Sequence, residues 1–174
     1  MSIPLHKKTG LSLVETLVYA SILALIFGVV VTSMVELSRS YKTLKVHRSM
    51  NLSSISGMER MIREIRQATN VVQTQSVFST SPGKLVLVTT LPDASTTTTE
   101  FYLATTTLMM KQGGVVLGAL TTASASVDSL IFRLIQNGNV SKAIKVEMQI
   151  TATDSGYSKT AKLYTSAILR GSYQ

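Results

Sequence analysis

The chain has 174 residues, which is enough for one apolar segment and one small domain but not for two sizeable hydrophobic cores. It contains no cysteine and only two histidines, so it has no disulfide, no thiolate metal site and little material for a catalytic triad. The formal net charge of +8 makes acidic partners and lipid headgroups candidates for binding.

The N-terminal part is dominated by an uncharged apolar run from Thr16 to Val35. At about 1.5 Å per helical residue, this run covers the roughly 30 Å hydrocarbon thickness of a bilayer. A secretory signal peptide is disfavoured, because its apolar core would be shorter, roughly 7 to 15 residues, and would end in a small-residue cleavage site. The run therefore predicts a transmembrane helix, preceded by a short basic leader with Lys7 and Lys8.

Glu15 is the one charged residue within residues 10–35. A carboxylate in the middle of a bilayer costs roughly 2.5–3.5 kcal/mol on the insertion scale, although the positive end of the helix dipole reduces this cost near the helix start. Two interpretations follow. Either Glu15 reaches the membrane interface, or it needs a cationic partner inside the membrane or inside a packed helix bundle.

The segment Lys8-Thr9-Gly10-Leu11-Ser12-Leu13-Val14-Glu15 resembles the processing motif of type IV prepilins and type II secretion pseudopilins. The resemblance implies that a prepilin peptidase cuts between Gly10 and Leu11 and that the new amino group of Leu11 is methylated. It also implies that Glu15 pairs with the terminal amine of a neighbouring subunit in a helical filament. Leu11 stands where the family more often has Phe. The apolar stretch also lacks the proline that is frequent in major pilins, which favours a minor subunit.

Basic residues flank the apolar run on both sides, with Lys7 and Lys8 before it and Arg39, Lys42, Lys45 and Arg48 after it. By the positive-inside rule alone, the C-terminal part would lie in the cytoplasm. The resemblance implies the opposite, because prepilin cleavage is cytoplasmic and the domain is translocated. We expect a single-pass protein of the inner (cytoplasmic) membrane with its C-terminal domain outside the cytoplasm, and later a periplasmic or extracellular filament.

Helical periodicity continues beyond the apolar run and is expected to end near residues 68–70. The apolar residues that recur at spacings of three and four predict one apolar side of the helix: Leu37, Tyr41, Leu44, Leu52, Ile55, Met58, Ile62 and Ile65. Arg60 and Glu64 form one of two opposite-charge pairs at four-residue spacing.

The basic residues Arg39, Lys42, Lys45 and Arg48 recur every three positions. They could form a track for DNA phosphates, because such contacts are electrostatic and need no aromatic side chains. They could equally form a solvated helix face against anionic headgroups or acidic neighbours in a filament. We favour the solvated face, since aromatic residues are not interleaved here beyond Tyr41.

Beyond residue 70 the periodicity changes from 3.6 to 2. Strands are predicted in the ranges 84–90, 99–103, 108–111, 130–134, 144–150 and 161–169. Turns follow at short intervals, including Asn137-Gly138-Asn139 and Asp154-Ser155-Gly156, with no room for crossover helices. Polar loops are expected over Ser79–Gly83 and Pro92–Thr98.

The predicted fold class is therefore α+β: a long N-terminal helix packed through Leu52–Ile65 on a mainly antiparallel sheet. The order of MIREIRQATN, FYLATTTLMMK, VDSLIFRL and a closing hairpin resembles J-type minor pseudopilins. The expected division is a leader over residues 1–10, a transmembrane or filament-core half-helix over 11–37, an amphipathic half-helix over 38–69 and a globular domain over 70–174.

The residues offer no catalytic, cofactor or metal site. His47 has no acid or histidine partner at ligand spacing, and Asp93, Asp128 and Asp154 occur singly, outside any calcium-loop pattern. Gly113-Gly114 lacks the Lys-Ser/Thr pair of a phosphate loop. We expect a substrate of enzymes, not an enzyme.

The function implied by the resemblance is that of a minor pilin or pseudopilin at or near a filament tip. Its partners would be other subunits, prepilin peptidase and inner-membrane lipid. An alternative is a DNA-binding or adhesive minor pilin that contacts DNA through residues 39–66 or surface strands. A third is an unrelated membrane-anchored domain.

Overall fold

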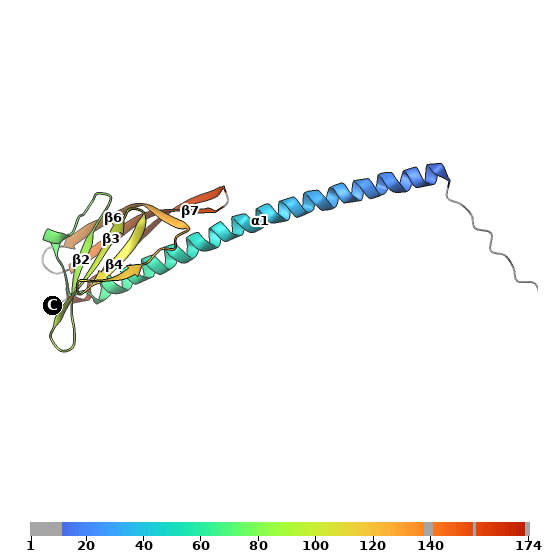
Figure 1. The fold of residues 1–174 in the computed structure, drawn as a ribbon. Helices are drawn as coiled ribbons and strands as arrows, with labels where there is room; N and C mark the ends of the chain where they lie inside the picture. The colour runs from blue at the N-terminus through green and yellow to red at the C-terminus, as the bar shows by residue number, and fades with distance from the viewer. Residues whose placement is uncertain (1–11, 138–140, 155, 173–174) are drawn as a thin grey trace, which may run out of the picture. The chain divides into compact units, whose positions relative to one another are not determined.

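The computed structural model describes residues 12–137, 141–154 and 156–172, and within them the chain is α+β (Figure 1). The helix α1 spans Leu13–Gln67 and is followed by antiparallel strands, which confirms the predicted fold class. The described residues form two compact units, with the boundary between Tyr41 and Lys42. Helix α1 ends at Gln67, directly before the region where the sequence predicted its end.

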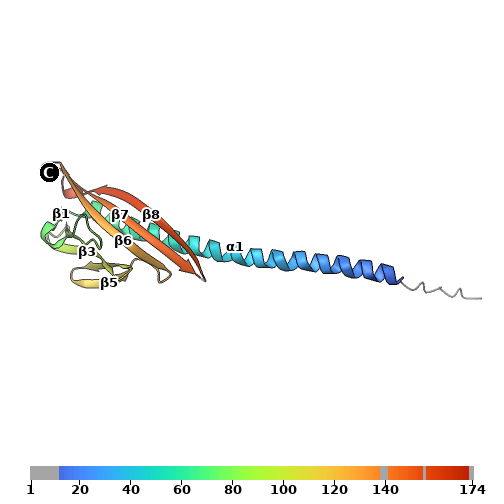
Figure 2. The same cartoon turned by 90° about the horizontal axis from the view of Figure 1, so that it is seen from above.

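The strands of the second unit form two antiparallel sheets instead of one (Figure 2). The five-stranded sheet has the order β1-β2-β3-β4-β5, with β1 Asn70–Val71, β2 Leu85–Thr90, β3 Thr96–Ala104, β4 Thr107–Gln112 and β5 Val115–Ala119. The three-stranded sheet has the order β6-β7-β8, with β6 Ala125–Asn137, β7 Ser141–Asp154 and β8 Tyr157–Ile168. Short 3₁₀ helices cover Gln73–Gln75 and Arg170–Ser172.

Each predicted strand is present, but several begin earlier than expected: β6 begins at Ala125 instead of residue 130, and β8 begins at Tyr157 instead of residue 161. Strand β3 begins at Thr96, within the stretch predicted as a loop over Pro92–Thr98, because the four threonines 96–99 pair with β2 and suit a strand. Strands β1 and β5 were not predicted. The first has two residues, and the second contains Gly118 and faces a register shift in β4, so neither shows a regular alternation.

One hydrophobic core lies between residues 46–65 of the helix and both sheets. Phe101, Leu108 and Met110 contribute from the five-stranded sheet, and the largest buried side chain of the three-stranded sheet is Phe132. In β7 the inward residues from Ile144 to Ala152 alternate with half-buried ones on the outer face. The sequence shows the same period of two, because Lys145, Glu147 and Gln149 alternate with apolar residues from Ile144 to Ile150.

The helix face predicted to pack on the sheet, Leu52–Ile65, is partly wrong. Leu52 and Ile55 are exposed to 57% and 55% of their surface, whereas Met58 and Ile65 are buried as expected. The residues that face the sheets instead include small or flexible ones: Val46, Met50, Ser53, Ser54, Gly57 and Met61. Small side chains let the sheet backbone approach the helix closely, and a Cβ at position 57 would lie 3.3 Å from Cδ2 of Leu108. Counting large apolar residues alone missed this face.

The loop Ser79–Gly83, predicted correctly, covers the free edge of β6. The Ser79 amide donates to the carbonyl of Phe132, and the Gly83 amide donates to the carbonyl of Leu130, both at 2.8 Å. A Cβ at Gly83 would lie 2.8 Å from the Leu130 carbonyl oxygen, so only glycine permits this approach. The predicted turn at Asn137-Gly138-Asn139 lies partly outside the described residues, as does Ser155 of the β7–β8 turn.

Candidate membrane-spanning and assembly segment

The four residues that carry the predicted processing site, Lys7, Lys8, Gly10 and Leu11, lie outside the described residues. The next predicted site residue, Glu15, lies in the first turn of α1. The unpaired backbone amides at a helix N-terminus carry partial positive charge, which favours a carboxylate at this position.

Residues 13–35 of α1 present their apolar side chains outward. The large apolar side chains in this range are between 44% and 80% exposed, and this helix near the N-terminus is long and apolar enough to cross a membrane. A soluble helix of a small domain would bury at least one such face against its own core. This surface is therefore suited to lipid or to other helices.

The polar side chains of the same range are satisfied within the helix. The hydroxyls of Thr16, Ser21, Thr32 and Ser33 donate to backbone carbonyls three or four residues earlier, at 2.8–3.1 Å. Such internal bonds matter little in water, where solvent supplies partners. In hydrocarbon each unsatisfied polar group would cost several kcal/mol, so this pattern fits a dry environment.

Glu15 also has a partner in its own helix. The hydroxyl of Tyr19 donates to Oε1 of Glu15 at an oxygen–oxygen distance of 3.3 Å, from a position four residues later on the same face. Tyr19 was not among the site residues predicted from the sequence. The signal that could have found it is the i, i+4 spacing between the single carboxylate of the segment and a hydroxyl donor.

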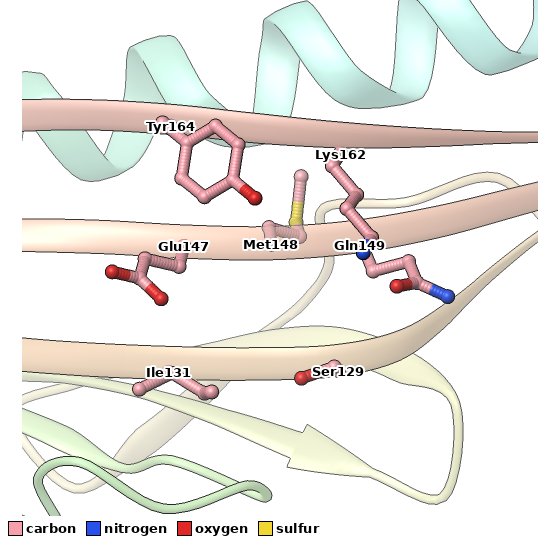
Figure 3. Close-up of a pocket in the computed structure, with 7 residues that line it drawn as sticks. All are labelled: Ser129, Ile131, Glu147, Met148, Gln149, Lys162 and Tyr164. Carbon is pink, nitrogen blue, oxygen red and sulfur yellow. The ribbon is translucent and has the colours of Figure 1, made fainter.

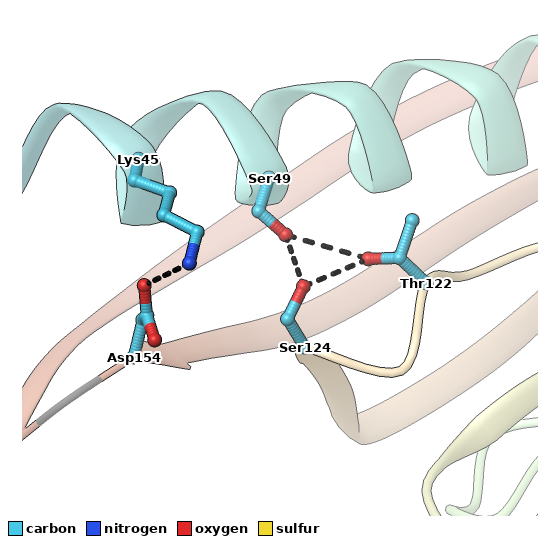
Figure 4. Close-up of polar contacts among 5 residues, drawn as sticks. All are labelled: Lys45, Ser49, Thr122, Ser124 and Asp154. Carbon is cyan, nitrogen blue, oxygen red and sulfur yellow. Dashed lines mark hydrogen bonds and ion pairs between the residues drawn. The ribbon is translucent and has the colours of Figure 1, made fainter. Parts of the chain in front are cut away.

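The four basic residues in the range 39–48 do not share one environment. Lys45 forms an ion pair with Asp154 at the end of β7, with Nζ 2.8 Å from Oδ2 (Figure 4). The side chain of Lys45 is 66% exposed, so this pair contributes at most about 1 kcal/mol. Arg39, Lys42 and Arg48 are exposed.

A seam of hydroxyl groups continues from this ion pair between the helix and the loop before β6. Ser49 shares hydrogen bonds with Thr122 and Ser124, as Figure 4 shows. One turn later, Ser53 lies 2.8 Å from the Thr122 hydroxyl and accepts a hydrogen bond from the Thr122 amide. The seam explains why Ser49 and Ser53 occupy helix positions that face the sheets, because each has a hydroxyl or amide partner there.

His47, predicted to be a surface residue without ligand partners, is half-buried beside β8. The Nζ of Lys159 lies 3.3 Å from its Nε2. Across residues 12–137, 141–154 and 156–172, no three His, Cys, Asp or Glu residues gather in a group that could hold a metal ion.

The outer face of the three-stranded sheet carries a groove of about 160 Å³ between Tyr164 on β8 and Ile131 on β6 (Figure 3). On its floor, Oε1 of Glu147 lies 2.9 Å from both Nζ of Lys145 and Nε of Arg133. The hydrogen bonds from Lys145 and then from Arg133 hold the pKa of Glu147 below its ordinary value. Strand alternation predicted the outward positions of Lys145 and Glu147, but not the ion pair of Glu147 with Arg133 on β6.

Searches for known relatives found no family model, no curated protein and no solved structure that matches the chain.

Proposed function

We propose that the chain is a minor subunit of a pilin-like filament, of a type IV pilus or of a type II secretion pseudopilus. It is held in the inner membrane by residues 13–35 before assembly. Prepilin peptidase removes the leader between Gly10 and Leu11 and methylates Leu11. The apolar half of α1 then leaves lipid and packs among the corresponding helices of neighbouring subunits, at or near the filament tip.

The observation that carries this proposal is the combination of an outward apolar helix surface with a single carboxylate in its first turn. Lipid alone accounts for the apolar surface, but not for Glu15. A cationic group of a neighbouring subunit would neutralise Glu15 and fix the axial position of one helix against the next. The processing motif around Gly10 supplies such a group, because cleavage there creates an amine on the neighbour's Leu11.

Two linked measurements test the proposal. Intact-mass spectrometry of the protein from cells that express prepilin peptidase should show a chain that begins at a methylated Leu11. Glu15→Ala should leave cleavage unchanged and reduce incorporation into sheared filaments, whereas Glu36→Ala, a matched carboxylate change further along the helix, should not. An intact leader, or full incorporation of Glu15→Ala, would contradict the proposal.

The alternative of a DNA contact through residues 39–48 has less support. The Lys45 ammonium is shared with Asp154, which reduces the positive charge it could offer to phosphates. Electrophoretic mobility shift of the full chain in detergent with duplex DNA at physiological salt would test it. Binding that Arg48→Ala weakens would favour this second function over a purely structural one.

A further inference from the structure

We infer, on the basis of the proposed function, that Tyr19 is a positioning residue for Glu15. Its hydroxyl supplies the carboxylate with a hydrogen bond while residues 13–35 lie in lipid, before any neighbouring subunit is present. The interaction is a single one within one helix, between Oη of Tyr19 and Oε1 of Glu15 at 3.3 Å.

Tyr19 is the donor that the geometry makes available to Glu15. The other hydroxyls in residues 13–35 donate to backbone carbonyls, including Thr16 next to Glu15, which donates to the carbonyl of Leu13. In the described part of the helix, Tyr19 alone therefore directs a side-chain donor at the carboxylate. Its ring is 57% exposed, so it occupies the outward surface that lipid would cover.

The hydrogen bond is compatible with the later ion pair. A carboxylate has two oxygens and about four acceptor sites, and Tyr19 uses only Oε1. Oε2 of Glu15 stays available to a cation of a neighbouring subunit, so Tyr19 need not be displaced on assembly. Tyr19 would then restrict the rotamers of Glu15 and orient Oε2 in advance.

A simpler role for Tyr19 is that of an interfacial aromatic residue, since tyrosine is enriched at membrane–water interfaces. That role depends on the amphipathic ring and is independent of Glu15. The two roles therefore differ in one measurable quantity, the energetic coupling between positions 15 and 19.

The test is a double-mutant cycle on membrane insertion of the full chain, synthesised without cells in the presence of phosphatidylethanolamine–phosphatidylglycerol liposomes. The readout is the ratio of carbonate-resistant to extractable protein for the wild type, Tyr19→Phe, Glu15→Ala and the double variant. We expect Tyr19→Phe to lower the ratio of carbonate-resistant to extractable protein about threefold more in the wild-type background than in the Glu15→Ala background. This factor is in line with hydrogen bonds measured between side chains in membranes. Tyr41→Phe, a matched change on the same helix with Leu37 four residues earlier, should show no coupling to Glu15.

An equal effect of Tyr19→Phe in both backgrounds would overturn the inference and leave the proposed function intact, because the phenol hydroxyl would then act independently of Glu15. Failure of the wild-type chain to insert would overturn both, since residues 13–35 would not span a bilayer. Coupling in liposomes together with normal filament incorporation of Glu15→Ala would uphold the role of Tyr19 and contradict the proposed function.

Discussion

The two parts of helix α1 share one backbone conformation but differ in which side chains they bury. Residues 13–35 expose their large apolar side chains and satisfy their polar ones internally. Residues 46–65 bury mainly small and flexible side chains against two sheets and leave Leu52 and Ile55 outside. The difference teaches that apolar character alone does not reveal which helix surface a protein covers with its own chain. Size and hydrogen-bond partners distinguish the two.

The largest expected difference in unfolding free energy is between two phenylalanine substitutions, one in the core of the β-domain and one in the apolar part of α1. Phe132→Ala removes a side chain that is fully buried between the helix and the three-stranded sheet, and should cost about 3–5 kcal/mol of unfolding free energy. Phe27→Ala removes a ring that is 67% exposed, and should leave unfolding of the β-domain unchanged. Chemical denaturation of the full chain in detergent, followed by the circular dichroism of the strands, measures both. Comparable losses would show that Phe27 also belongs to a core.

A second pair of substitutions tests which face of the helix packs on the sheets. Met61→Ala should cost about 2–5 kcal/mol, because Met61 is fully buried. Leu52→Ala should change the unfolding free energy by less than about 0.5 kcal/mol, because Leu52 is 57% exposed. The same denaturation experiment applies. A larger loss of unfolding free energy for Leu52→Ala than for Met61→Ala would show that the helix packs through the face predicted from apolar spacing.

A third pair of substitutions replaces glycine by alanine, at a packed position and at an open one. Gly83→Ala places a Cβ 2.8 Å from the Leu130 carbonyl oxygen and 3.0 Å from Cδ2 of Phe132, and should destabilise the β-domain by about 1–3 kcal/mol through local overpacking. A Cβ at Gly28 meets nothing within 4 Å, so Gly28→Ala should leave the domain unaffected. Thermal unfolding of the two variants compares them directly, and an unchanged midpoint for Gly83→Ala would contradict the packing of the loop against β6.

Much of the fold follows from the sequence, because period and turn residues report local structure. Strand β7 alternates without interruption from Ile144 to Ile150, and the helix contains no proline from Leu13 to Gln67. The division into two sheets could not be predicted, because it depends on contacts between distant segments. The helix face was misjudged for a related reason: Ser53 and Gly57 become interface residues only because a hydroxyl seam and Leu108 lie opposite them.

The candidate site was predicted at the level of single residues. Glu15 stands out in any reading of charge along the chain, whereas Tyr19 becomes informative only when its hydroxyl is placed beside the carboxylate. The ion pair of Lys45 with Asp154 joins residues that are far apart in sequence. Spacing along the helix could not reveal it.

The smallest expected effect is a pH dependence on the outer sheet face. The pKa of Glu147 is lower in the folded state than its ordinary value, owing to hydrogen bonds from Lys145 and Arg133. Its contribution to stability is therefore present above the unfolded-state pKa and is lost as the pH falls through the folded-state pKa. Lys145→Met should raise the pKa of Glu147 towards the ordinary value in an NMR titration of the carboxyl carbon. An unchanged titration would contradict the ion pair between Lys145 and Glu147 along β7.

The proposed membrane-spanning role of residues 13–35 predicts that lipid surrounds this part of the helix. The chain contains no cysteine, so Leu25→Cys and Leu52→Cys each give one site for a spin label. Both native side chains are exposed in the folded chain, at 69% and 57%. In lipid nanodiscs, electron paramagnetic resonance should find the label at position 25 accessible to oxygen and protected from a water-soluble nickel reagent, with the reverse at position 52. Equal access of the nickel reagent at both positions would contradict the membrane-spanning role of the segment.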